Sequence, residues 1–378
     1  MNISITKYNA CCNLGNNIDE IYKEALKGNS ELFNLNNEII KDKNIRIAEI
    51  KKELPAINEP DFNIRCNRLV LDVLIPLNNT IKELIDKYSS SRIGIAVATT
   101  NSGINEYENT NNILHSELGN PALFIKEYYG LNSFYISVST ACSSGIKAFS
   151  IAKNIIENDI VDAVIVVGVD PIANVPLFGF HSLEILTDTK TNPFSINRNG
   201  INLGEAAAAF IVEKEQPAGI KIMGIGETSD TYHATTPDPE GIETIRAINI
   251  ALKESNLTPT DIDYINLHGT GTVSNDLMEA RAINKVFGEI VPASSTKPMT
   301  GHCLGAAAGI EIALCCALLD NFEGKLYPHI YDGEYDTNLP KIKLVDKVEE
   351  YNKCNICMCN SFGFGGSNAI LILGKSNE

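Results

Sequence analysis

One cysteine of this chain occupies a position where a nucleophile could be exposed. Cys142 lies in VSTACSSGIKAF (138–149), between small residues, where an apolar stretch typical of a strand meets a predicted helix. Such a turn presents the side chain at the strand tip. The first helical N–H groups lower the pKa of a thiol placed there, which yields the attacking thiolate. A structural cysteine would also suit this stretch, because free cysteines are commonly buried.

Further segments place chemically capable side chains in loops of small residues. His268 opens the loop in NLHGTGTVSND, and Lys297 and His302 flank the loop in SSTKPMTGHCLGAAAGIE. In NSFGFGGSNA, Phe364 gains nothing at an exposed turn between two predicted strands unless it has a task. Taken singly, the histidines and the lysine also suit ordinary loop, capping and surface roles. Together with Cys142, two of the chain's six histidines at strand ends indicate acyl chemistry on a thioester.

Alternating strands and helices must position these residues. In the first half the predicted strands cover 3–7, 92–100, 135–140, 162–170 and 206–214, and the predicted helices cover 17–27, 66–87 (with a possible kink at Pro76) and 144–158. In the second half the strands begin at 219, 261 and 355, and the helices cover 241–256, 275–288 and 305–321. This alternation predicts an α/β fold. Each half contains an Ala-rich helix typical of a buried central layer, and the polar EKEQPAG segment predicts halves 1–215 and 216–378.

Composition excludes several classes of partner. Lysine and arginine number 31 against 47 acidic residues, a net charge of −16, which argues against nucleic acid or an anionic membrane as the main partner. The N-terminal residues lack the pattern of a signal peptide and no apolar run is long enough to span a bilayer, so we expect a cytoplasmic protein with reduced cysteines. Cys354, Cys357 and Cys359 have metal-like spacing, but they alternate as in a strand and lack a second Cys/His pair, so we expect no metal.

Six motifs point to a family when they are taken in order. STACSSG, NPFSINRNGINLGEAAAAF, TSDTYHATTPDPEG, HGTGTVSND, STKPMTGHCLGAAAGIE and NSFGFGGSNA follow one another between residues 138 and 369. On these motifs the chain resembles the β-ketoacyl-acyl-carrier-protein synthases, the elongating condensing enzymes of the thiolase-like superfamily. The resemblance implies a layered α-β-α-β-α fold made of two similar halves. It also implies decarboxylative Claisen condensation with malonyl-acyl carrier protein to give 3-oxoacyl-acyl carrier protein, in fatty-acid or polyketide/aryl-polyene-type biosynthesis.

The resemblance implies a role for each motif residue. Cys142 would accept the acyl chain, and His268 and His302 would bind the malonyl thioester carbonyl and promote loss of carbon dioxide. Lys297 would tune the charge of the histidines, within a network held by Glu311.

The remaining motif residues would handle the acyl chain and the carrier arm. Phe364 would gate the acyl pocket, and its backbone N–H would form an oxyanion hole with that of Cys142. Thr270 and Thr272 would bind the phosphopantetheine arm of the carrier protein, and no other cofactor is implied. The implied assembly is a homodimer, with a heterodimer of related subunits as the other possibility. The acidic carrier protein requires local positive charge, for which the resemblance indicates these arginines: Arg65, Arg68 and Arg198.

Some positions depart from the family pattern. Ser195 and Asn199 replace aspartates, and Ala206 replaces a glycine, although Arg198 remains. Residues 99–134 are shorter than the corresponding segment of relatives, so the acyl-chain length stays open. Catalytically silent chain-length partner subunits are an alternative class, but these lack the nucleophilic cysteine. A cysteine hydrolase would have no use for two histidines and a lysine.

Overall fold

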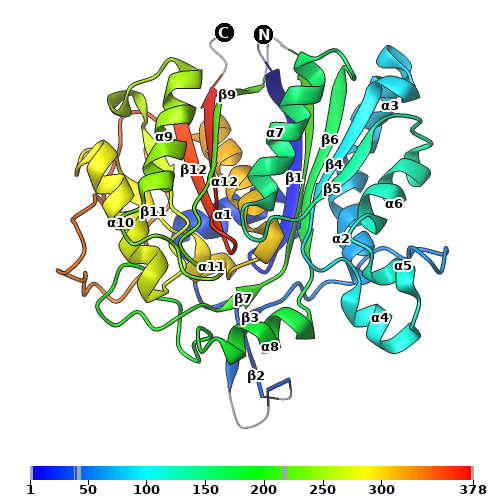
Figure 1. Ribbon diagram of the computed structural model, residues 1–378. Coiled ribbons are helices and arrows are strands. Elements are labelled where there is room, and N and C mark those ends of the chain that lie inside the picture. Colours follow the sequence, from blue (N-terminus) through cyan, green and yellow to red (C-terminus); the bar gives the residue numbers. More distant parts are fainter. Residues whose placement is uncertain (1–2, 38, 41–43, 215–218, 376–378) are drawn as a thin grey trace.

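Two similar sets of strands form the frame of the protein. The computed structural model describes residues 3–37, 39–40, 44–214 and 219–375 (Figure 1). The N-terminal set comprises β1 (Ile3–Cys12), β4 (Ile93–Ala98), β5 (Tyr135–Val138), β6 (Ala163–Asp170) and β8 (Ala206–Lys214). The C-terminal set comprises β9 (Ile220–Ser229), β10 (Tyr264–Asn266), β11 (Ala293–Ser294), β12 (Ile356–Gly363) and β13 (Ser367–Lys375).

The two sets share one topology. The sheet order over the described residues is β11-β10-β12-β13-β9-β1-β8-β6-β4-β5. If the strands of each set are numbered one to five in chain order, both sets run 3-2-4-5-1 from the outer edge to the centre of the sheet. In both sets the fifth strand is antiparallel to its two neighbours, and the second strand is parallel to the third and the fourth. Within the described residues, the two sets pair where Ser4 and Ile5 of β1 meet Lys221 and Ile220 of β9. The predicted α/β fold of two similar halves is therefore confirmed.

Two helices lie between the strand sets as a central layer. The helices α7 (Ser144–Glu157) and α12 (Ala307–Asn321) contact each other, and α12 touches strands of both sets (Figure 1). A Cβ at Gly145 would lie 2.7 Å from the Ala308 Cβ, so glycine lets the helices approach closely. The segment Leu304–Asn321 is the one described helical stretch long and apolar enough to cross a membrane. It is 89% buried, as expected of a core helix.

Other helices cover the outer faces. The N-terminal set carries α2 (Arg65–Leu74), α3 (Asn78–Tyr88) and α6 (Asn120–Tyr129), and the C-terminal set carries α9 (Ile242–Ser255) and α10 (Val273–Phe287). The helix α1 (Ile18–Lys27) packs against α12. The order of layers is therefore outer helices, one strand set, the central helices, the other strand set and outer helices, which is the expected α-β-α-β-α arrangement.

Most predicted elements are present, with informative differences. The predicted helix 66–87 is two helices, because Pro76 lies in the 3₁₀ turn Ile75–Leu77 between α2 and α3 and has no N–H to donate. The sequence did not predict several short elements: α4 (Ile104–Thr110), α5 (Ile113–Ser116), α6, α8 (Asn174–Ser182), β2 (Asn34–Asn36), β3 (Ile45–Ala48) and β7 (Leu203–Gly204). The boundary placed between residues 215 and 216 lies outside the described residues and stays a prediction.

Candidate active site

A strained turn between β5 and α7 presents Cys142. Ala141 adopts the left-handed conformation with φ 55°, which is uncommon for a residue with a Cβ. The Ser144 hydroxyl accepts the Thr140 N–H at 2.8 Å, and the Ser361 hydroxyl donates to the Cys142 carbonyl at 2.7 Å. These bonds fix the turn from both halves of the chain. The Cys142 side chain therefore stands at a strand tip, as predicted, although it is only 7% exposed.

His302 is the immediate partner of the cysteine. Its Nε2 atom lies 3.0 Å from the Cys142 sulfur, and its Nδ1 atom accepts the Leu304 N–H at 3.0 Å. A backbone N–H can only donate, so the neutral ring must carry its proton on Nε2. Burial, together with the positive charge of Lys297, lowers the pKa of His302 to about 3. His302 is therefore a neutral ring that points an N–H at the sulfur.

His268 is held in the same tautomer by a different donor. The Lys297 ammonium lies 3.3 Å from the Nδ1 atom of His268 and 2.5 Å from a carboxylate oxygen of Glu311. Lys297 and Glu311 are each 1% exposed. Burial and the Lys297 charge hold the pKa of His268 well below its usual value, with a further contribution from His302. Because the ammonium donates to Nδ1, the free N–H of His268 is on Nε2.

The state of the thiol differs from the sequence-based expectation. Burial raises the pKa of Cys142 to about 12, and the positive charge of Lys297 only partly opposes this. The prediction of a thiol acidified by the helix N-terminus is therefore wrong, because the closed surroundings outweigh the helix. Cys142 rests as a thiol and must lose its proton as substrate binds.

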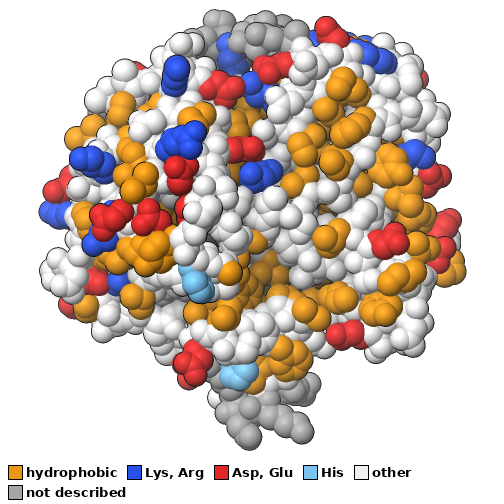
Figure 2. Space-filling model, viewed as in Figure 1, with side chains coloured by type: hydrophobic (Ala, Val, Ile, Leu, Met, Phe, Trp, Pro, Cys, Tyr) orange, Lys and Arg blue, Asp and Glu red, His pale blue; other side chains and the backbone are white. Residues whose placement is uncertain are grey.

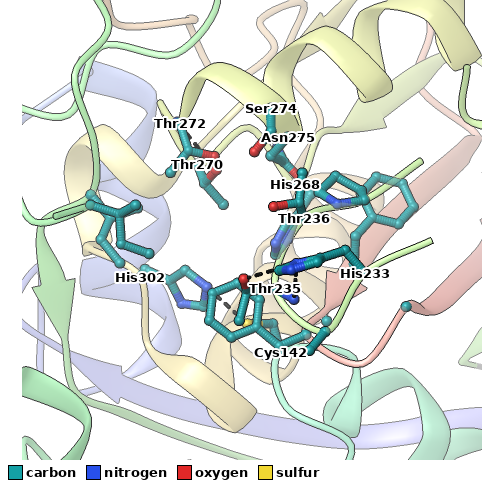
Figure 3. A pocket seen from close by; sticks show the side chains of 18 of the residues that line it. Cys142, His233, Thr235, Thr236, His268, Thr270, Thr272, Ser274, Asn275 and His302 are labelled. Carbon is teal, nitrogen blue, oxygen red and sulfur yellow. Dashed lines mark hydrogen bonds between the residues drawn. The ribbon is translucent and has the colours of Figure 1, made fainter. Parts of the chain in front are cut away.

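Two hollows meet at the cysteine. The first, here called the reaction cavity, contains Cys142, His268 and His302 at its base, with Thr270 and Phe364 among its other walls (Figure 3). In Figure 3 the two histidines and Cys142 point into one space below the hydroxyl side chains of Thr270, Thr272 and Ser274.

The second hollow is an apolar groove of about 420 Å³ on the other side of Cys142. Its apolar walls come mainly from α8 and the residue that follows it, namely Val175, Phe180 and Leu183, together with Leu304 from the turn before α12. Phe364 lines both hollows. The Phe364 and Phe180 rings lie 5.7 Å apart. Figure 2 shows a hollow with apolar side chains near the centre of this face of the molecule.

Comparison with known proteins assigns this site to a family. The model of the β-ketoacyl synthase N-terminal domain matches residues 87–218, and that of the C-terminal domain matches residues 220–329. The chain belongs to the β-ketoacyl synthase family. Nodulation protein E of Rhizobium leguminosarum bv. trifolii is 30% identical, with 98% of both chains covered. The 3-oxoacyl-[acyl-carrier-protein] synthase 2 of Staphylococcus aureus is 28% identical over 99% of this chain and 98% of its own.

A solved structure agrees with this assignment. A chain of the complex between a ketosynthase and its chain length factor, from Xenorhabdus doucetiae, matches with a TM-score of 0.94 and 36% identity. The match covers 99% of this chain and 98% of that one. The predicted family, the thiolase-like fold and the condensing-enzyme class of acyltransferase are therefore confirmed.

The structure of this β-ketoacyl synthase brings most predicted residues to the cavity. Thr270 and Thr272 line it, with their hydroxyl oxygens 2.9 Å apart. Phe364 also lines it and is 37% exposed.

The predicted carrier-docking arginines lie elsewhere. Arg198 is buried and pairs with Asp336 at 2.6 Å, so its prediction as a docking residue is wrong, because its charge is already neutralised inside the protein. Arg65 pairs with Glu205 at 2.5 Å, and Arg68 donates to the Asn63 side chain. For Arg65 and Arg68 the docking role stays a prediction.

Two buried carboxylates that support the site were not predicted. Glu279 on α10 accepts the backbone N–H groups of His268 and Gly269 at 2.8 and 2.7 Å. Asp170 accepts N–H groups on both sides of the apolar groove, including that of Gly305. For Asp170 the sequence offered one signal, namely an aspartate at the end of an otherwise apolar predicted strand, DAVIVVGVD.

Proposed function

We propose that this protein is an active β-ketoacyl-acyl-carrier-protein synthase that acylates Cys142 and then condenses the acyl group with malonyl-acyl carrier protein. The observation that carries the proposal is the 3.0 Å contact of the Cys142 sulfur with the Nε2–H of His302, beside a second neutral histidine backed by Lys297. A chain-length partner subunit without chemistry would need neither the thiol nor two such donors.

The first step is acyl transfer. The Cys142 sulfur attacks the carbonyl carbon of the acyl thioester, a new S–C bond forms, and the bond to the phosphopantetheine sulfur breaks. The proton of the Cys142 thiol ends on the released phosphopantetheine thiol. The backbone N–H groups of Cys142 and Phe364 are the proposed oxyanion hole, and losing one such donor costs about 3 to 4 kcal/mol. The apolar groove receives the acyl chain, and Phe364 between the hollows gates it.

The second step makes the carbon–carbon bond. The bond between the methylene carbon and the carboxylate of the malonyl group breaks, carbon dioxide leaves, and the electron pair forms an enolate on the thioester. The Nε2–H groups of His268 and His302 donate to the enolate oxygen, which places neutral donors where negative charge develops. The enolate carbon then attacks the acyl-cysteine carbonyl, and the Cys142 sulfur leaves and takes up a proton from solvent.

Donor geometry supports chemistry without a metal. Cys142, His268 and His302 have potential ligand atoms within 4.8 Å of one another. A metal needs a ring nitrogen with a free lone pair, whereas both Nδ1 atoms accept hydrogen bonds and both Nε2 atoms carry protons. The Lys297 ammonium would also repel a cation. We therefore propose that the substrates need only the phosphopantetheine of their carrier, bound by Thr270 and Thr272.

The proposed partners are an acyl carrier protein and a second condensing-enzyme subunit in the cytoplasm. The strand β5 is one of the two edge strands of the sheet, and exposed apolar side chains of α8, Val175 and Phe178, lie beside the groove. A related chain was solved with its chain length factor, and a homodimer is the other candidate. A second subunit over this face would cover the groove.

Intact-protein mass spectrometry tests the proposal directly. The protein is mixed with a panel of acyl-carrier thioesters beside a Cys142→Ala variant. We expect an acyl adduct on the wild type alone, and the preferred acyl mass identifies the chain length. An unmodified wild type with every donor, alone and with candidate partner subunits, would contradict the proposal.

A further inference from the structure

Asp170 gathers an unusual number of donors at the end of β6. Its carboxylate is fully buried and accepts the hydroxyl groups of Thr99 and Thr100, each at 2.8 Å. It also accepts the N–H groups of Thr100 at 2.9 Å and Asn101 at 3.0 Å. A fifth donor, the Gly305 N–H, comes from the opposite half of the chain at 2.6 Å. One carboxylate therefore ties together the ends of two strands and a loop that is 135 residues away.

The Gly305 bond leads directly to the catalytic histidine. Gly305 follows Leu304, whose N–H sets the proton position on the His302 ring, and Leu304 adopts a left-handed φ of 53° that turns the chain towards Gly305. A Cβ at Gly305 would lie 2.7 Å from the Asp170 carboxylate oxygen, so glycine is required for this close approach. Asp170 thus anchors the strained loop immediately after the donor of His302.

The other bonds of Asp170 lead to the apolar groove. Thr100 and Asn101 line the groove across from α8, and Leu304 lines it as well. A chain bound in the groove therefore contacts two segments that the same carboxylate holds. No other described carboxylate has partners on both of these segments.

We propose that Asp170 is a positioning residue that couples the shape of the apolar groove to the proton position on His302. The inference rests on the proposed function, because it gives His302 its role as an Nε2–H donor beside Cys142. The carboxylate holds the Gly305–Leu304 backbone so that the Leu304 N–H meets Nδ1. It also holds Thr100 and Asn101, so that this wall of the groove keeps a fixed position relative to the Leu304–Gly305 loop.

Asparagine at position 170 cannot reproduce this arrangement. The amide offers one acceptor oxygen and one NH₂ group. If the NH₂ group replaces Oδ2, it faces the Gly305 N–H. If it replaces Oδ1, it faces the Asn101 N–H. In either orientation a buried backbone donor loses its acceptor. Asp170→Asn should therefore release one of the two segments, and Gly305→Ala should separate the loop from an intact carboxylate.

The experiment combines two readouts that do not depend on condensation. The ¹⁵N spectrum of labelled histidine reports the tautomer of His302, and the chain has only six histidines to assign. The rate of Cys142 alkylation by iodoacetamide reports the donor at the sulfur. Acyl-chain preference is measured separately by competition between short and long acyl-carrier thioesters.

A control comes from a partly buried carboxylate that also binds backbone N–H groups and pairs with the exposed Lys353. Asp263 accepts the Asn355 and Ile356 N–H groups at 2.8 and 3.1 Å, with 6% of its side chain exposed. It directly precedes β10 and binds the start of β12, whereas the candidate site lies at the end of β12. Asp263→Asn removes a carboxylate that holds two backbone N–H groups but has no link to His302.

The expected pattern separates coupling from general destabilisation. Asp170→Asn and Gly305→Ala should replace the single Nε2–H form of His302 by a mixture of tautomers and slow Cys142 alkylation about tenfold, the effect of one hydrogen bond to a charged sulfur. Thr99→Val removes one donor to Asp170 on the strand side, so coupling through the carboxylate should change both the His302 spectrum and the acyl-chain preference, the latter about threefold. Asp263→Asn should change neither readout.

Other results would overturn the inference. A folded Asp170→Asn variant with the wild-type His302 spectrum, or an equal change in Asp263→Asn, would make Asp170 merely structural. If Asp170→Asn does not fold, Gly305→Ala decides the question by the same spectrum. A failure of the proposed function would appear separately, as a wild-type protein that takes no acyl group while its His302 signals still respond to Asp170→Asn.

Discussion

Replacing Lys297 by methionine tests the electrostatic design of the site. The ammonium of Lys297 has two described side-chain partners, Glu311 and the Nδ1 atom of His268. The other carboxylate oxygen of Glu311 has no hydrogen-bond partner. Methionine fills the same volume, so Lys297→Met removes the charge and leaves Glu311 buried without a donor.

The cost depends on pH in a way that the structure specifies. Removing one member of a buried pair costs about 3 to 5 kcal/mol. Burial already raises the pKa of Glu311 to about 7, with the Lys297 charge opposing. Because the pKa of Glu311 is higher in the folded than in the unfolded protein, protonated Glu311 contributes its full stability below the unfolded-state pKa. This contribution is lost as the pH rises through the folded-state pKa. Without the Lys297 charge the folded-state pKa of Glu311 is higher still, so the variant keeps losing stability above pH 7, where the wild type does not. The free-energy difference between variant and wild type should therefore grow by about 1.4 kcal/mol per unit above pH 7.

Two measurements on paired variants check this reasoning. The chain contains no tryptophan, so denaturant unfolding at pH 6, 7, 8 and 9 is followed by circular dichroism. Lys297→Met combined with Glu311→Leu should return to within about 1 kcal/mol of the wild type, because an apolar pair replaces the ionic one. Condensation by the double variant should stay about 100-fold reduced, because His268 has lost the donor that fixes its tautomer.

A pH-independent penalty in Lys297→Met would refute the argument about Glu311. A stable double variant with wild-type condensation would refute the argument about His268.

Two further changes follow from the site geometry. A Cβ at Gly363 would lie 2.7 Å from the carbonyl oxygen of Thr140, so Gly363→Ala should displace the turn and slow adduct formation about tenfold or more, measured by timed mass spectrometry. The folded-state pKa of His302 is depressed to about 3, so its neutral form contributes stability above the unfolded value that is lost as pH falls from about 6.5 towards 3. His302→Gln should flatten the acid limb of the stability curve by about 1.4 kcal/mol per pH unit, and an unchanged limb would show that the ring is protonated in the folded protein.

Local patterns indicated the residues of the candidate site because their signals are local. Cys142 and His268 follow apolar strands and precede small residues, and these features are visible within a dozen positions of sequence. The strand order and the pairing of Cys142 with His302 depend on contacts between distant segments. The family motifs supplied that information, whereas composition and periodicity could not.

The errors have a shared physical cause, which is burial. Arg198 was predicted to meet a carrier protein but neutralises Asp336 inside the fold. The thiol of Cys142 was predicted to be acidic, but exclusion of water raises its pKa. Asp170 drew no prediction, since its partners at Asn101 and Gly305 lie 69 and 135 positions away. Burial is a property of the assembled layers, and a single sequence reports it only indirectly.

The charges around the reaction cavity are placed to favour decarboxylation rather than tight binding of the malonyl carboxylate. Among the described residues, neither a lysine nor an arginine lines the reaction cavity. The nearest cation, Lys297, is 1% exposed and is directed at Glu311 and at the back of the His268 ring. A cation in the cavity would bind the malonyl carboxylate and stabilise the ground state, which raises the barrier to losing carbon dioxide. Neutral N–H donors on His268 and His302 instead favour the enolate oxygen, where the charge arrives only in the transition state. In the proposed mechanism Lys297 therefore acts through the proton position on His268, and its separation from the substrate is part of that role.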